Sequence, residues 1–220
     1  MCIRDRDKVV IGLFDPSKFR YVYLSENISS FIGYTASELL TNEQTLVSLN
    51  PSTRPYYPSL IFEFIKEMDA QADPLRRREM YLGGLKFKHG KSGKLKTIFI
   101  KSRVLAYTKE GLPSLGLQLF EDIGHLVKGS PVWCRCVFGD NNFVRFFSLD
   151  HPKQYLKDMV TKRELEILKM LDDNKDSKEI GQQLGISKDT VLKHRKNMLV
   201  KIGAKDSTAL IHLCKLCNVL

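Results

Sequence analysis

Apolar residues follow two different periods along this chain of 220 residues. Over the first 150 residues they alternate with polar residues in short runs, which is typical of half-buried strands. From residue 161 onward they recur every three or four positions, the spacing of amphipathic helices. The length allows two small domains. We expect a sheet-containing domain at residues 7–127, a hairpin and connector at 128–155, and a helical domain at 156–220.

Five runs predict the strands of the N-terminal domain: VVIGLFD, RYVYLS, MYLGGLKFKHG, LKTIFIKSRVLAY and SLGLQLFED. Between the second and third runs, ENISSFIGY and TASELL predict two brief helices broken at Gly33, and a longer helix is expected at about 58–72. Residues 90–93 and 110–111 favour hairpin turns between the last three strands. This order predicts an α+β fold, an antiparallel sheet with helices on one face.

A further hairpin is predicted between the two domains, where VWCRCVFGDNNFVRFFS holds two alternating runs around a turn at 139–142. In the first run, Val132, Cys134 and Cys136 share one face, and Trp133, Arg135 and Val137 share the other. The aromatic residues are a large apolar load for so small an element. We hypothesise that this hairpin docks on the N-terminal sheet or on the last helix and carries a signal between the domains.

A helix-turn-helix motif is predicted within SKEIGQQLGISKDTVLKHRKNML. Ser177 is expected to cap a first helix that ends near Leu184, because a serine hydroxyl accepts from the amides of a first turn. Gly185 supplies the turn, and Ser187 caps a second helix that Gly203 ends. The second helix of such a pair fits the major groove of DNA.

Two more helices are predicted on either side of the motif. Thr161 and Glu164 form a capping box that opens the helix before it. Asp206 and Ser207 offer caps for a last helix that runs to about Cys217. That last helix is apolar on more than one side, so it needs a second cover besides its own domain. A twin subunit and the N-terminal domain are the two alternatives.

The second helix of the motif carries the candidate DNA contacts. Its charged residues sum to five positive and one negative, which attracts a phosphate-lined groove. The residues on its apolar stripe are Val191, Met198, Leu199 and Ile202. Lys193 and Lys196 are predicted to donate to guanine, and Asn197 to pair with adenine. The residues predicted to contact phosphates are Lys188, Thr190, His194 and Lys201.

Residues 161–220 resemble the DNA-binding domain of the LuxR family of bacterial regulators, through TKRELEILKML, SKEIGQQLGIS, KDTVLKHRKNMLVKIG and STALIHL. The family's usual Glu-Ile-Ala becomes Glu-Ile-Gly here, and Gly181 keeps a small residue where the helices cross. The resemblance implies a four-helix domain that binds double-stranded promoter DNA as a homodimer. Similar four-helix domains occur in sigma factors, so the alternative is a protein-interaction module that contacts RNA polymerase.

The N-terminal part resembles a PAS domain through VYLSENISSFIGYTASELL, FKHGKSGKLKTIFI and LQLFEDIGHL. This resemblance implies a domain that binds a small-molecule ligand or cofactor, or pairs with another copy, and passes the change to an output domain. A plain dimerisation scaffold is the alternative. The Asn-Cys-Arg-Phe-Leu-Gln stretch of flavin-linked photosensors has no match, and the cofactor stays unassigned.

Composition narrows the class of protein. The net charge is +10, and residues 1–150 and 151–220 carry +5 each, so the shorter part is denser in positive charge. With no run of 18 apolar residues and no signal peptide, we expect a cytoplasmic protein with no membrane partner. No set of catalytic residues stands out, which predicts a regulator and not an enzyme. The cysteines are expected to be reduced core residues without a metal.

The opening MCIRDR resembles the translated read-through of a sequencing adaptor. We leave residues 1–6 out of the fold prediction and expect that the natural N-terminus, with any upstream segment, is missing.

Overall fold

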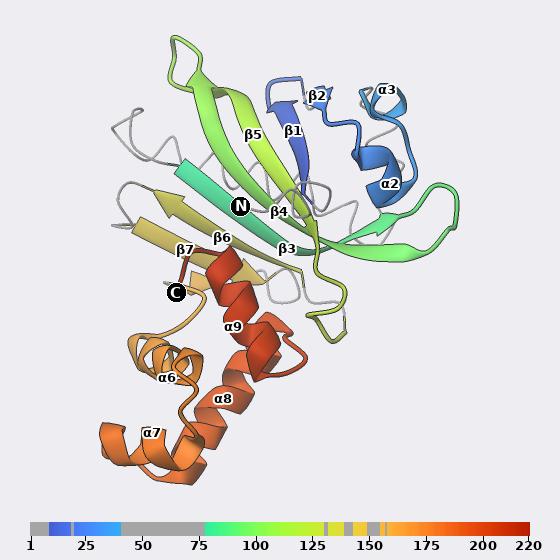
Figure 1. Cartoon of the computed structure of the whole chain (residues 1–220). Helices are drawn as coiled ribbons and strands as arrows, with labels where there is room; N and C mark the ends of the chain where they lie inside the picture. The colour runs from blue at the N-terminus through green and yellow to red at the C-terminus, as the bar shows by residue number, and fades with distance from the viewer. Residues whose placement is uncertain are drawn as a thin grey trace.

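The structure is a computed structural model that describes residues 9–18, 20–40, 78–129, 132–138, 143–148, 155–156 and 158–220 (Figure 1). In chain order the elements are β1 (Val10–Asp15), β2 (Arg20–Leu24), α2 (Ile28–Ile32), α3 (Ala36–Leu39), β3 (Arg78–Lys88), β4 (Leu95–Tyr107), β5 (Pro113–Asp122), β6 (Trp133–Phe138), β7 (Phe143–Ser148), β8 (Tyr155–Leu156), α6 (Lys162–Asp172), α7 (Ser177–Leu184), α8 (Lys188–Ile202) and α9 (Ser207–Leu216). The predicted fold class is confirmed: an α+β domain with an antiparallel sheet precedes a helical domain.

The described strands form one sheet in the order β2-β1-β5-β4-β3-β6-β7-β8, and each neighbouring pair is antiparallel. The hairpin predicted between the domains is β6–β7, and it extends this sheet beyond β3. Gly83 lies opposite Trp133 in the β3–β6 register. A Cβ atom at Gly83 would lie 2.3 Å from Cζ2 of Trp133, so only glycine leaves room for the indole ring.

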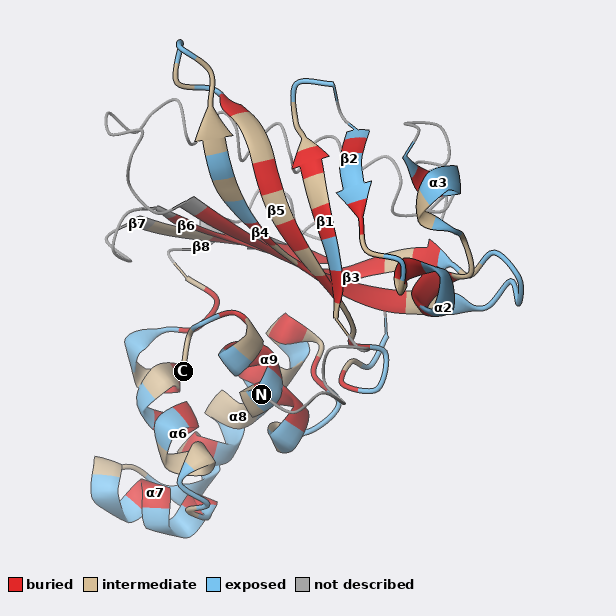
Figure 2. Cartoon of the chain, turned by 45° about the horizontal axis from the view of Figure 1, so that its top comes forward, coloured by how far each residue is buried: buried red, intermediate tan, exposed pale blue. Residues whose placement is uncertain are grey.

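Alternate residues of the central strands enter two different cores. On one face, under α2 and α3, the buried side chains include Met80, Ile98 and Cys134. On the opposite face, Tyr81 and Trp133 belong to a second core together with buried side chains of the C-terminal helices. Figure 2 shows this arrangement, with α2 and α3 on one side of the sheet and α9 on the other. The strands therefore form a wall between the two cores.

The second cover of α9 is the N-terminal sheet. Leu210, Leu213 and Cys214 are fully buried and share one core with Phe99 and Trp133 of the sheet. The C-terminal end of α9 lies at β6, where the Arg135 side chain donates to the Cys217 carbonyl. Of the two covers left open by the sequence, the structure supplies the N-terminal domain. The hairpin accordingly meets both proposed docking partners, the sheet and the last helix.

The predicted break at Gly33 between two short helices is confirmed. Gly33 ends α2 in the left-handed region at a φ of 77°, and Thr35 begins α3 with a capping box. The four cysteines within the described residues are buried and form no disulfide, and burial raises the pKa of Cys214 to about 12. The expected helix at 58–72 lies outside the described residues. None of the described helices has the length and apolar character needed to cross a bilayer.

Candidate nucleic-acid interface

Capping residues fix the helix-turn-helix. The predicted Ser177 cap is wrong by one position, because the Asp176 side chain accepts from the amides of Lys178 and Glu179 and completes a capping box. An aspartate one residue earlier offers a charged acceptor to the same first turn, which a serine cannot match. Gly185 ends α7 at a φ of 65°, and Ser187 caps α8 by accepting from the Thr190 amide, as predicted.

The close crossing of α7 and α8 depends on Gly181. A Cβ atom there would lie 2.7 Å from the carbonyl oxygen of Ile186, so the small residue expected at the crossing is needed in this arrangement. On α8, Val191, Met198 and Ile202 are fully buried. These three side chains are the core of the predicted apolar stripe, so the opposite side of α8 faces away from the domain.

Arg195 anchors α8 to both neighbouring helices. Its Nη1 donates to Oγ of Ser177 at 2.6 Å, and its Nη2 donates to Oγ of Ser207 at 2.8 Å. Both serines stand at the first position of their helices, α7 and α9. One guanidinium therefore sets the distance between the starts of these two helices, a use for the planar fork of donors that a lysine could not serve.

Lys201 lies on the α6 side of α8 and is paired within the domain. Its Nζ lies 2.8 Å from Oε2 of Glu164, a buried carboxylate that also closes the Thr161 capping box. Burial raises the pKa of Glu164, but hydrogen bonds from Lys201 and Thr161 outweigh it and hold this pKa below its ordinary value. Lys201 is thus a predicted DNA contact whose charge is already opposed by a carboxylate within hydrogen-bond distance.

The remaining predicted contacts surround the outward side of α8. The exposed members are Lys188, Lys193, Lys196 and Asn197, while Thr190 and His194 are half-buried. Leu192 was not assigned to any role from the sequence, yet it is exposed among these residues. Its spacing of four residues from both Lys188 and Lys196 was the signal that could have placed it there. Figure 1 shows α7 and the start of α8 at the end of the molecule farthest from the sheet.

The comparisons identify the helical domain. Residues 158–214 match the family described as bacterial regulatory proteins, luxR family. Spore germination protein GerE from Bacillus subtilis (strain 168) is 39% identical over 61 residues, which are 27% of this chain and 82% of GerE. The chain belongs to the luxR family of bacterial regulatory proteins. This membership confirms the prediction of a DNA-binding transcription regulator that is not an enzyme.

Solved structures align over longer stretches at low similarity. The N-terminal domain of a diguanylate cyclase with PAS/PAC sensor from Marinobacter aquaeolei is 13% identical, with a TM-score of 0.41 over 54% of this chain and 97% of that chain. The Vibrio cholerae VqmA dimer in the absence of target DNA is 15% identical, with a TM-score of 0.35 over 94% and 81%. Escherichia coli SdiA is 17% identical, with a TM-score of 0.30 over 98% and 86%.

In this luxR-family regulator, side chains of β6 bind the C-terminal ends of two helices. Nε1 of Trp133 donates to the carbonyl of Ile202, the last residue of α8, at 3.1 Å. Nη1 of Arg135 donates to the carbonyl of Cys217, the C-cap of α9, at 2.9 Å. Carbonyls at a helix C-terminus have no partner within the helix and carry the negative end of its dipole. A strand of the sheet therefore caps both helices.

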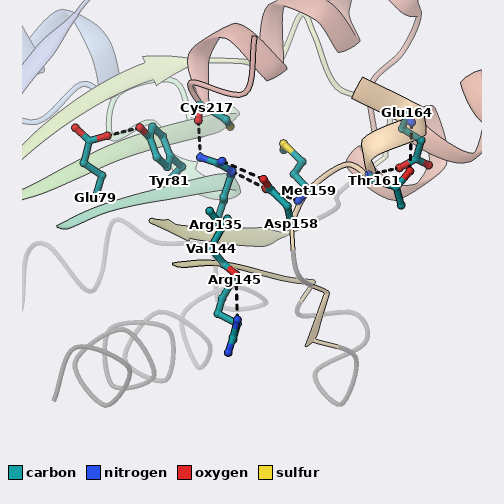
Figure 3. Close-up of polar contacts among 10 residues, drawn as sticks. All are labelled: Glu79, Tyr81, Arg135, Val144, Arg145, Asp158, Met159, Thr161, Glu164 and Cys217. Carbon is teal, nitrogen blue, oxygen red and sulfur yellow. Dashed lines mark hydrogen bonds and ion pairs between the residues drawn. The ribbon is translucent and has the colours of Figure 1, made fainter. Parts of the chain in front are cut away.

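Arg135 also forms an ion pair at the entrance to the helical domain. Its Nε and Nη2 donate to the two carboxylate oxygens of Asp158, at 2.8 and 3.2 Å (Figure 3). Arg135 is only 3% exposed, so its buried positive charge requires this carboxylate to compensate the lost hydration. Close by, backbone hydrogen bonds join Lys128 to Gly203 and Lys205 to Leu126. The recognition helix α8 is thus fixed to the sheet at its C-terminal end.

A small apolar cavity lies on the opposite face of the sheet. Its volume is about 20 Å³, and α2, α3 and the strands β2 to β5 line it with side chains such as Phe31, Leu39 and Phe120. Tyr21 supplies a polar group, and its hydroxyl donates to Oε1 of Gln118 at 2.7 Å. A volume of this size holds a water-sized group. Two short helices cover the cavity, so a larger occupant requires them to move.

Proposed function

We propose that this regulator is a cytoplasmic homodimer in which a small-molecule ligand of the N-terminal domain controls DNA binding, with β6 as the connection. The observation that carries this proposal is that neighbouring residues of β6 belong to different cores. Cys134 and Cys136 lie in the core that surrounds the cavity, whereas Trp133 and Arg135 hold the ends of α8 and α9. Because a close-packed strand moves as a unit, a shift on one face reaches the other.

For DNA reading, we propose that Lys193, Lys196 and Asn197 contact base edges and that Lys188, Thr190 and His194 contact phosphates. Lysine donates to guanine, and asparagine pairs with adenine. The exposure of both lysines supports this assignment. Lys201 contributes less, because Glu164 already opposes its charge.

For the ligand, we propose a small, uncharged and largely apolar molecule. Burying a charge against this apolar lining would cost far more free energy than the lining could return. The pair of Tyr21 and Gln118 offers one polar contact at the cavity. Ligand pockets for drug-sized molecules enclose about 300–1,000 Å³, so binding must lift α2 and α3 and thereby strain the sheet beneath them.

Two recognition helices are needed to read two half-sites of a duplex, which supports the homodimer. The covered face of α9 is occupied by the sheet, so we propose that the subunits meet through another surface in this arrangement. Sedimentation equilibrium of the full chain tests the association directly. A protein that stays monomeric at the concentration where it occupies its DNA site contradicts the homodimer.

Selection of bound fragments from random duplexes tests the DNA-binding proposal, followed by a salt series on the selected site. Each phosphate contact should contribute a slope of about −0.9 to the plot of log K against log salt. A module that chiefly contacts RNA polymerase would select no sequence and show a shallow slope.

Ligand control has its own measurement, because Trp133 is the only tryptophan of the chain and lies buried between the two domains. A ligand that opens the cavity should shift the fluorescence of Trp133 and change affinity for the selected site. A bound ligand that changes neither signal contradicts the coupling through β6.

A further inference from the structure

The recognition helix exposes an apolar side chain among its cations. Leu192 is 42% exposed, although Val191 beside it is fully buried. It stands four residues after Lys188 and four before Lys196, and both lysines are exposed. Residues four apart are neighbours on a helix surface, so the three side chains form one row. A second row, Asp189–Lys193–Asn197, lies beside the first.

The side chains of this row are exposed, whereas other side chains of α8 bind its neighbouring helices. Arg195 reaches the starts of α7 and α9, and Lys201 reaches α6. Leu192 lies between the directions of Arg195 and Lys196 around the helix axis, in the second turn of α8. Residues near the N-terminal end of a recognition helix are the ones that contact base edges in the major groove. Leu192 therefore lies where the proposed base contacts lie.

We propose that Leu192 is a specificity-determining residue that recognises the C5-methyl group of a thymine next to the base pair contacted by Lys193 or Lys196. In the major groove the thymine methyl is the apolar feature of the base edges, and apolar side chains read it by contact. The flanking lysines hold the helix in the groove through charge, and Leu192 supplies discrimination that charge cannot. This inference rests on the proposed function, because it requires α8 to lie in the major groove.

Val200 is the matched control on the same helix. It is 74% exposed, more than Leu192, and it belongs to the last turn of α8, next to the end that Trp133 holds. A general effect of exposed apolar surface would therefore be larger at Val200. A contact with a base edge would appear only at Leu192.

The test replaces single thymines by uracil in the duplex that the full chain selects, since uracil lacks only the methyl group. For the unsubstituted chain, each half-site should contain one position at which a single uracil weakens binding about fourfold. This factor corresponds to the ~0.8 kcal/mol of one buried methyl-sized group. Leu192→Ala should bind the thymine and uracil duplexes equally at that position. Val200→Ala should keep the fourfold preference for thymine.

The outcomes separate this inference from the proposed function. If the chain selects no duplex, the proposed function fails and the inference fails with it. If the chain binds its site with a steep salt dependence but no uracil change weakens binding, Leu192 does not read a methyl group. The same conclusion holds if Leu192→Ala keeps the preference for thymine, or if Val200→Ala loses it.

Discussion

Replacing Asp158 by asparagine should expose how much the domain junction depends on one buried charge. Arg135 is 3% exposed, and its guanidinium donates two hydrogen bonds to Asp158 and one to the Cys217 carbonyl. The substitution leaves this guanidinium buried beside a neutral amide whose NH₂ group faces another donor. Breaking a buried pair in this way costs about 3–5 kcal/mol, and we expect about 3 kcal/mol because the introduced amide would keep one acceptor oxygen. For a chain of this size, that is a decrease in Tm of about 6–12 °C.

Replacing the other partner of the ion pair, Arg135, should lower the free energy of unfolding less. Arg135→Met removes the buried charge itself and leaves Asp158, which is 30% exposed on its side chain, free to be hydrated. Its main cost is the orphaned Cys217 carbonyl, about 1–3 kcal/mol. The variant that carries both Arg135→Met and Asp158→Asn should therefore be more stable than Asp158→Asn alone. The two changes in unfolding free energy would then be far from additive.

The assay is urea unfolding followed by Trp133 fluorescence and by circular dichroism. Coincident transitions would show that the two domains unfold as one unit, as their shared core requires. Glu166→Gln is the control, because its exposed pair with Arg163 should contribute less than about 1 kcal/mol. The reasoning is refuted if Arg135→Met destabilises the chain more than Asp158→Asn, since the buried charge would then not be the dominant cost.

Three further tests, with five single substitutions, concern the site and the junction. Lys193→Ala and Lys196→Ala should each weaken binding to the selected duplex by about 1–3 kcal/mol and reduce the base preference at one position, whereas Lys201→Ala should weaken binding less. Equal losses for all three variants in a binding titration would reject the assignment. Trp133→Phe keeps an aromatic ring but removes the hydrogen-bond donor to α8. The free energy of unfolding of this variant, followed by circular dichroism, should be lower by about 1–2 kcal/mol. An unchanged value would show that this hydrogen bond contributes nothing to stability. Glu164 has a lowered pKa in the fold, so its contribution to stability is present above its unfolded pKa and is lost as pH falls through the folded value. Glu164→Gln should remove this contribution from the dependence of the unfolding free energy on pH. An identical pH dependence in the variant would contradict the assignment.

The sequence alone predicted the local structure of the recognition element closely. The turn at Gly185, the Ser187 cap and the buried side of α8 agree with the structure because each depends on residues within a few positions of one another. The Asp176 cap was missed because two capping residues stand side by side and the sequence does not rank them. The ion pair between Lys201 and Glu164 could not be predicted, because a lysine on a basic helix gives no sign of a carboxylate on another helix, 37 residues away.

The sequence by itself thus determined a sheet-containing domain, a helix-turn-helix and the charge of its outward side. Only the tertiary structure decided that β6 joins the sheet beside β3, that α9 is covered by this sheet, and that Trp133 and Arg135 bind helix ends 69 and 82 residues away. Periodicity shows which side of an element is apolar, but any apolar surface can cover it. Strand order and register select the one that does.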